Sequence, residues 1–242
     1  MPSEALAKDG IMWSIPALTH ELVSIVFSPD AITCSWIQKT KTATAPLIVR
    51  AYKKYPLHNL ELYNLIPFNL TSIKKHIRSF LCEHGLQDAF VIFCLDGIAE
   101  KCVALPTSTP HCADFNMPTV SSIQWEYRYL YSDHDGHYIF YVYALPRSLI
   151  LQYELLAIGL CCNLIGIATK TAALLDAYKN IFGAAFRKSQ LAIDMMRHDN
   201  DIQALITDDA VRRMVSFSGG IAKEDYSTIA AACGMFCAER IE

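Results

Sequence analysis

One segment near the start of the chain, residues 22–38, constrains the fold more than any other. It reads LVSIVFSPDAITCSWIQ: an apolar run, a turn built on Ser28-Pro29-Asp30, and a second run that alternates. This pattern predicts two strands joined by a tight turn. Turns of this shape between strands often hold phosphate, yet this one contains no glycine. It is therefore a nucleotide site, a nucleotide site that has decayed, or an ordinary hairpin.

The following residues predict that this turn opens an antiparallel meander, which a helix follows. Three runs rich in β-branched and aromatic residues are expected to be strands: Leu22–Phe27, Ala31–Gln38 and Ala45–Tyr55. After an irregular stretch, the side chain of Asn69 or Thr71 can cap a helix, and Gly85 ends it. The apolar residues of this helix recur at helical spacing: Ile73, Ile77, Phe80 and Leu81.

Two Asp-Gly pairs predict tight turns, because glycine accepts positive φ without steric cost. The first pair, Asp96-Gly97, follows the apolar strand Phe90–Leu95 and predicts a hairpin whose returning strand ends at Pro106. The second pair, Asp135-Gly136, precedes a strand at Tyr138–Ala144. The strand before that pair carries a stripe of tyrosines, which is either sheet packing or a partner surface: Tyr127, Tyr129 and Tyr131.

The rest of the chain repeats this layout in outline. Helices are expected at Arg147–Leu160 and Thr171–Phe182, on either side of a short buried strand, Leu164–Ala168. A second meander begins at Leu191, with VRRMVSFSGG as its third strand, and a final helix covers residues 225–240. Two meanders that each open with an apolar strand and a tight polar turn are the layout of actin-like folds. In those folds the two opening turns hold one phosphate chain.

Composition limits the class of protein. The 242 residues are 52% hydrophobic and 19% charged, which is enough apolar material for a sizeable core. A formal net charge of -3, without a basic stripe, argues against nucleic-acid binding. Nine cysteines at scattered spacing, after a start that does not resemble a secretion signal, predict free thiols in a reducing compartment. The uncharged part of the most apolar region, residues 155–168, is shorter than the roughly 18 residues of a membrane span, so membrane contact is expected only through a partner.

Other polar clusters give weak signals for chemistry. SDHDGH, residues 132–137, contains metal-binding residue types, but residues on a tight turn point apart, so a solvated hairpin tip is the preferred interpretation. Cys82 with His84, and His111 with Cys112, lack a visible third group to orient a Cys–His pair. We therefore expect no catalytic residue and no metal site.

Several segments together carry a pattern that covers most of the chain. VIFCLDGIAEKCVALP is a strand, a turn and a return strand, and residues 138–178 are a strand, a small-residue turn, a long helix, a short strand and a helix. Residues 191–220 hold a polar hairpin and end in Gly-Gly, and DYSTIAAACGMFCAE is a small-residue helix. With VSIVFSPDAITCSWIQ, these segments resemble the PilM family of type IV pilus assembly proteins and its shorter relative HofM.

The resemblance implies a mixed α+β and α/β fold of actin-like (ribonuclease H-like) lobes, with an inserted small α+β subdomain of the SHS2 type and a shortened second lobe. It divides the chain into a lead-in (residues 1–20), the first lobe (21–106), the inserted subdomain (107–170) and the second lobe (171–242).

The sequence departs from this family at the positions that contact nucleotide. The family's aspartate and glycine of the first turn fall on Val26 and Ser28, and a lysine position falls on Thr33. In the second turn Asp194 is kept, but the glycine position falls on Met196. Glycine lets backbone N–H groups approach phosphate, and carboxylates hold Mg²⁺, so these changes predict a decayed site.

The residues left at the two turns are expected to be vestigial for nucleotide binding: Ser28, Asp30, Thr33 and Asp194. Pro29 removes a backbone donor from the first turn, and carboxylates without a cation repel phosphate. We therefore expect no cofactor; ATP with Mg²⁺ is the alternative.

The function that the resemblance implies is a non-catalytic cytoplasmic scaffold of type IV pilus assembly, or of a related secretion or competence system, at the inner membrane. Its expected partner is the cytoplasmic tail of a PilN-like membrane protein, docked between the two N-terminal subdomains. Self-association is left open. The alternatives are an actin-like ATPase with altered phosphate turns and a cytoplasmic domain of a type II secretion protein of the GspL type.

Overall fold

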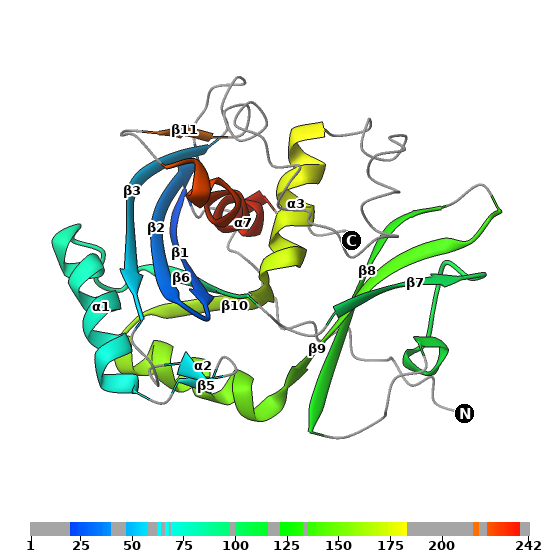
Figure 1. The fold of residues 1–242 in the computed structure, drawn as a ribbon, viewed down its shortest axis with the longest axis horizontal. Helices are drawn as coiled ribbons and strands as arrows, with labels where there is room; N and C mark the ends of the chain where they lie inside the picture. Colours follow the sequence, from blue (N-terminus) through cyan, green and yellow to red (C-terminus); the bar gives the residue numbers. More distant parts are fainter. Residues whose placement is uncertain are drawn as a thin grey trace.

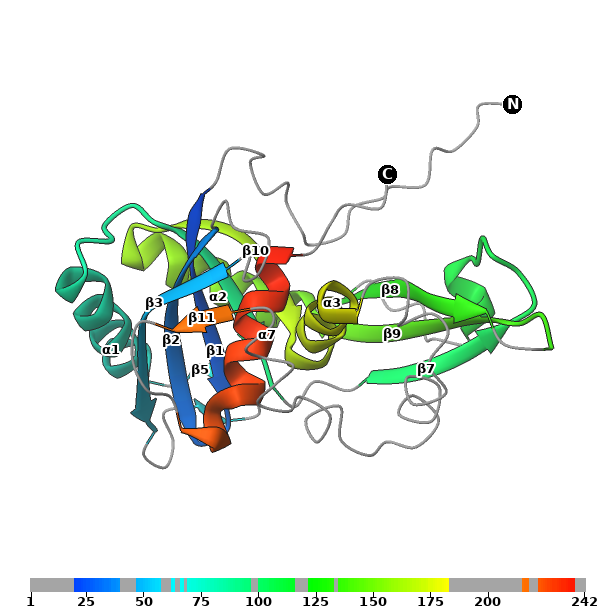
Figure 2. The same cartoon turned by 90° about the horizontal axis from the view of Figure 1, so that it is seen from above.

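The computed structural model describes residues 20–39, 47–57, 62–63, 66–67, 69–96, 100–115, 122–132, 135–182, 215–217 and 222–237. These residues form a six-stranded sheet with helices on both faces, and a three-stranded sheet that projects from it (Figures 1 and 2).

The six-stranded sheet has the strand order β10-β6-β1-β2-β3-β11. Its strands in chain order are β1 (Glu21–Ser28), β2 (Ala31–Lys39), β3 (Leu47–Pro56), β6 (Phe90–Leu95), β10 (Asn163–Thr169) and β11 (Val215–Phe217). The predicted meander is confirmed, because β1 pairs antiparallel with β2 and β2 with β3. On the other side of β1, β6 and β10 run parallel to it. A separate pair of short strands joins β4 (Leu62–Tyr63) to β5 (Ile66–Pro67).

Helices α1 and α2 pack on one face of this sheet, and α3 and α7 pack on the other (Figure 1). Their bounds are α1 (Leu70–Glu83), α2 (Arg147–Leu160), α3 (Lys170–Phe182) and α7 (Tyr226–Cys237), the last preceded by the 3₁₀ turn η3 (Lys223–Asp225). The expected cap of α1 is confirmed, since Asn69 Oδ1 accepts the N–H of Ser72 at 3.1 Å. Among the described residues, no helix is both long and apolar enough to span a membrane.

The apolar run of β1 is explained by burial on both faces. Successive side chains of a strand point to opposite faces of the sheet. Val23, Ile25 and Phe27 therefore lie in the core beside α1 and α2, whereas Leu22 and Val26 lie in the core beside α3 and α7. A strand covered by helices on both faces needs no alternation with polar residues.

The three-stranded sheet has the order β7-β9-β8 and extends away from the helices (Figure 2). Its strands are β7 (Glu100–Leu105), β8 (Ile123–Ser132) and β9 (Tyr138–Pro146). The predicted Asp135-Gly136 hairpin is confirmed by the antiparallel pairing of β8 with β9. Along β9, Tyr141 and Tyr143 pack into the core of the body, whereas Phe140 and Val142 pack with Phe115 of the 3₁₀ turn η1 (Cys112–Phe115).

The predicted hairpin at Asp96-Gly97 is wrong. β6 pairs with β1 and β10, both in parallel, and β7 pairs with β9 of the other sheet. Both edges of β6 are therefore occupied inside the central sheet. Its continuously apolar sequence is typical of a strand among parallel neighbours, which is covered on both faces.

Sheet membership also differs from the expected division of the chain. β7 lies in the three-stranded sheet although it precedes residue 107, and β10 lies in the six-stranded sheet although it precedes residue 171. β11, expected as the third strand of a second meander, pairs parallel with β3 of the six-stranded sheet. The other strands expected in that meander lie outside the described residues. Residues 183–214, which contain the second predicted turn with Asp194 and Met196, lie outside the described residues.

Candidate functional site

Polar residues that follow three parallel strands lie together at one edge of the six-stranded sheet. Phe27 of β1 is in register with Leu95 of β6, and Leu95 is in register with Thr169 of β10. The next residues along the three strands are therefore abreast of one another: Ser28, Asp96 and Lys170. The carboxyl ends of parallel strands are where open α/β sheets bind ligands, so this edge is the candidate site.

Asp96 is the centre of this group. Its Oδ2 accepts hydrogen bonds from Ser28 Oγ at 3.2 Å and from Lys170 Nζ at 2.8 Å. The backbone N–H of Asp96 donates to the carbonyl oxygen of Phe27 at 2.9 Å, which holds the carboxylate beside the β1–β2 turn. We call Ser28, Asp96 and Lys170 the Asp96 cluster.

The ion pair between Lys170 and Asp96 is largely shielded from water. The side chain of Lys170 is 8% exposed and that of Asp96 is 26% exposed. An ammonium group with so little contact with water requires a compensating carboxylate, and Asp96 provides it. The positive charge of Lys170 is therefore already neutralised within the protein.

The predicted nucleotide residues lie in different surroundings. Ser28 belongs to the Asp96 cluster, and Asp30 is exposed in the turn. Thr33 is buried within β2, opposite Val26 of β1. Val26 is fully buried beside α3 and α7, so its side chain points into the core and not toward the turn.

A second polar group lies where β3 meets the start of α7. Lys54 Nζ is 3.1 Å from Asp225 Oδ1, and the side chain of Asp225 is only 11% exposed. Thr33 is in register with Lys54 across β2 and β3. Burial, and then the neighbouring Asp225 carboxylate, raise the pKa of Tyr52 above its usual range. The Tyr52 hydroxyl therefore stays protonated, and this group links the sheet to the helix.

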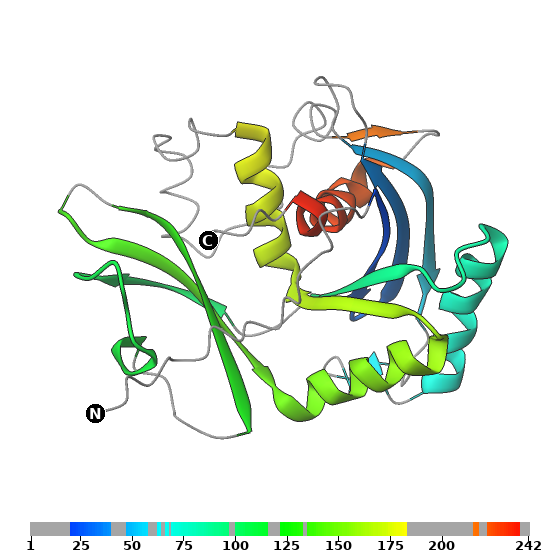
Figure 3. The same cartoon turned by 180° about the vertical axis from the view of Figure 1, so that it is seen from behind.

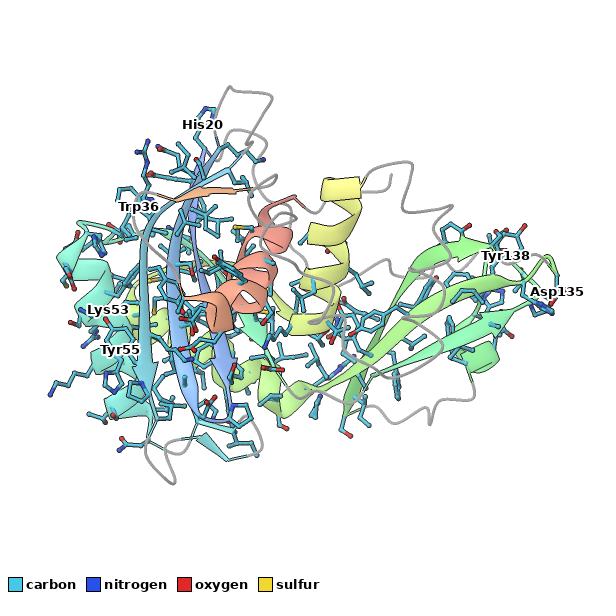
Figure 4. All side chains as sticks on the ribbon, turned by 45° about the horizontal axis from the view of Figure 1, so that its top comes forward. His20, Trp36, Lys53, Tyr55, Asp135 and Tyr138 are labelled. Atoms are coloured by element: carbon cyan, nitrogen blue, oxygen red, sulfur yellow. The ribbon has the colours of Figure 1, made fainter. Side chains whose placement is uncertain are left out.

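The groups of the Asp96 cluster bind one another. Ser28 Oγ donates to a carboxylate that also binds Lys170, and no imidazole lies within the cluster to act as a general base. Among the described residues, no group of three or more His, Cys, Asp or Glu side chains is placed to hold a metal ion. Asp135, from the predicted hairpin tip, lies at the far end of the β8–β9 hairpin (Figure 4).

The sequence pattern indicates Ser28, but neither Asp96 nor Lys170, as a site residue. Asp96 is predicted only as part of a turn, and the helix that Lys170 begins is predicted to start one residue later. The positions of Asp96 and Lys170 in the sequence could have identified both as site residues. Each is the first charged residue after an apolar strand, at the end where parallel strands meet.

No known protein family matches the sequence, and no curated protein matches it. Among solved structures, a chain of a PilM–PilN type IV pilus biogenesis complex is similar, with a TM-score of 0.54 and 12% identity, over 67% of this chain and 51% of that chain. The likeness shows the fold: it is actin-like. The fold class predicted from the resemblance to PilM is confirmed at this level.

Two further structures are similar at a lower TM-score of 0.37. The cytoplasmic domain of EpsL, an inner-membrane component of the type II secretion system of Vibrio cholerae, is 10% identical, over 63% of this chain and 57% of that chain. A Bacteroides thetaiotaomicron protein with an actin-like ATPase fold and unknown function is 9% identical, over 68% of this chain and 58% of that chain. The match therefore spans between 51% and 58% of the length of each of these three chains.

Proposed function

We propose that this chain is a non-catalytic scaffold of an inner-membrane assembly of the type IV pilus or type II secretion kind, and that it binds the cytoplasmic tail of a PilN-like membrane protein. The observation on which the proposal depends is the Asp96 cluster. It fills the edge where an actin-like fold would hold phosphate with groups that satisfy one another. The fold shared with a chain of the PilM–PilN complex supports the class of partner.

Electrostatics at the β1–β2 turn oppose polyphosphate binding. Phosphate would have to displace Asp96 from Lys170, or lie close to the carboxylates of Asp96 and Asp30, which repel it. Pro29 offers no backbone N–H, and Val26 is turned into the core. An actin-like body with these side chains is suited to docking and not to hydrolysis.

The three-stranded sheet offers a tail both a strand edge and an aromatic face. Among the strands that the structure describes, β8 is the outermost of this sheet, so an extended peptide can add beside it through backbone hydrogen bonds. Tyr127 of β8 is 44% exposed, and its ring centroid lies 5.2 Å from that of Phe115 and 5.8 Å from that of Phe140. We place the tail along β8 because these rings offer apolar side chains of a bound peptide a surface beside that edge.

Tyr127→Glu is expected to weaken tail binding by at least about tenfold, since it puts a charge where an apolar peptide side chain would lie. The probes are synthetic cytoplasmic tails of the inner-membrane proteins encoded beside this chain, with scrambled tails as controls, in fluorescence polarisation. The matched control is Leu155→Glu, which changes an exposed apolar residue of α2. This variant should bind the tail as tightly as the wild type does. Equal affinity of the wild type and Tyr127→Glu would contradict the location, and equal binding of native and scrambled tails would contradict the function.

A second candidate function is nucleotide binding through rebuilt contacts. One observation favours it: Lys170 is a buried lysine at the carboxyl edge, and its ammonium would bind a phosphate if it released Asp96. In calorimetric titration with ATP and Mg²⁺, we expect no saturable binding up to about 1 mM. Micromolar binding that Lys170→Met abolishes would replace the scaffold proposal with this one.

A further inference from the structure

The outer face of α2 carries an apolar stripe that the proposed function does not use. Leu151 and Leu155 are 54% and 53% exposed, and Ile158 is 70% exposed. The other large apolar side chains of this helix are buried: Leu149, Ile150, Tyr153, Leu156 and Leu160. In Figure 3, α2 lies at the outside of the molecule, and among the described elements no helix or strand lies beyond it.

The spacing of the stripe residues indicates which secondary structure a bound segment would have. With Ser148, which is also exposed, the stripe residues are three, four and three positions apart along α2. This alternation lines one side of an α-helix and is the pattern into which a second helix packs at a shallow angle. An extended peptide has a side-chain period of two and would not follow it.

Helix α1 sets the charge along one side of the stripe. Arg78 donates a hydrogen bond to the carbonyl oxygen of Gly159 at 2.6 Å, and the ammonium group of Lys74 lies against the same glycine. Gly159 follows Ile158 directly and is one helical turn from Leu155. Among the ion pairs of the described residues, none involves Lys74 or Arg78. This flank is therefore positive, and Glu154 lies on the opposite flank.

We propose that the stripe on α2, with Lys74 and Arg78 beside it, is the docking site of an amphipathic helix from another protein, whose apolar face is flanked by acidic residues. Charge complementarity argues for acidic flanks. Size argues against a second copy of this chain. The three side chains expose on the order of 300 Å² of apolar surface, whereas a stable dimer buries about 800 Å² on each partner. The site lies apart from the Asp96 cluster and does not depend on the proposed function.

The probe is a synthetic helix of about 18 residues, a length at which an isolated helix can form in water. It carries leucines at the heptad positions and glutamates beside them. Two peptides serve as controls: one has the same composition with the leucines scrambled, and the other has lysines in place of the glutamates. Binding to the full chain is measured by fluorescence polarisation. We expect the acidic helix to bind at micromolar concentration, and both controls to bind at least about tenfold more weakly.

Variants of the chain locate the site. Leu155→Glu is expected to weaken binding of the acidic helix by at least about tenfold. The control is Tyr127→Glu, which changes an exposed residue of the three-stranded sheet and should leave this binding unchanged. Ile158→Ser is a second test should Leu155→Glu fold poorly, because Ile158 is the most exposed of the three apolar stripe residues. Lys74→Glu should weaken binding about three- to tenfold, and Lys75→Glu, the same charge change on the neighbouring residue, should have little effect.

Three results would overturn the proposal. The first is equal binding of the acidic helix and its scrambled form, or no binding up to about 1 mM. The second is a dimer of the wild-type chain, seen by sedimentation, that Leu155→Glu converts to a monomer, because a second copy would then cover the stripe. The third is binding to phosphatidylglycerol-containing vesicles that Leu155→Glu abolishes while the acidic helix does not bind, because the stripe would then face lipid.

Discussion

Gly234→Ala is expected to lower the free energy of unfolding by about 3 kcal/mol, measured by urea denaturation. Gly234 lies in α7, where this helix packs against α3. A Cβ at this position would overlap the carbonyl oxygen of Ala173 and lie 2.8 Å from the amide nitrogen of Ala177. These are backbone atoms and cannot rotate away. The two helices would have to separate, which would open the close-packed core that they share with the sheet.

Gly159→Ala is the matched control, because it adds the same methyl group to another helical glycine. At Gly159 the new Cβ would meet only the end of the Lys74 side chain, with its ε-carbon at 2.7 Å. That side chain is flexible, and alanine favours a helix over glycine by up to about 1 kcal/mol, so we expect unchanged or slightly higher stability. If Gly234→Ala were as stable as Gly159→Ala, close contact between the backbones of α3 and α7 could not be the reason for glycine at 234.

Local signals predict the helices well, because a helix is specified by residues close together in sequence. The four apolar residues predicted for α1 are its buried residues, and the Asn69 cap is present. The bounds predicted for α2 are those observed. The spacing that predicts α2 does not show which of its leucines stay exposed, since that depends on what covers each face.

Strand pairing is where the sequence fails, because pairing joins residues far apart in the chain. Asp96-Gly97 is a strong local turn signal, yet β6 finds its neighbours in β1 and in β10, about 70 residues away. Likewise, Val215–Phe217 is correctly predicted as a strand, but the sequence does not indicate that it pairs with β3. A turn motif describes the chain near the turn and contains no information about which strand edges are already occupied.

The candidate site is predicted in part for the same reason. Ser28 follows from the β1–β2 turn, which is local. Its partner Asp96 is 68 positions away, and Asp96 pairs with Lys170 a further 74 positions along the chain. Only the parallel register of β1, β6 and β10 brings these three residues to one edge of the sheet.

Asp96→Asn is expected to lower the free energy of unfolding by about 2 to 4 kcal/mol, the second large effect. Asparagine keeps the size of the side chain and an oxygen acceptor for Ser28. It removes the negative charge that compensates Lys170, whose side chain is 8% exposed. The uncompensated ammonium is then buried in the folded state but hydrated in the unfolded state. The lost hydration lowers the free energy of unfolding. Urea denaturation of the single variant measures it.

The exposed ion pair between Lys53 and Glu83 is the matched control for this cost. Its N–O distance is 2.7 Å, close to the 2.8 Å of the Lys170–Asp96 pair, but its side chains are 43% and 50% exposed. Water solvates whichever charge remains, so Glu83→Gln should lower the free energy of unfolding much less than Asp96→Asn does. Adding Lys170→Met to Asp96→Asn should restore most of the lost stability, because no charge is then buried. If Asp96→Asn cost no more than Glu83→Gln, Lys170 would not depend on Asp96 for its charge balance. It would then be free to meet a phosphate, and the case for a scaffold without nucleotide would lose its main support.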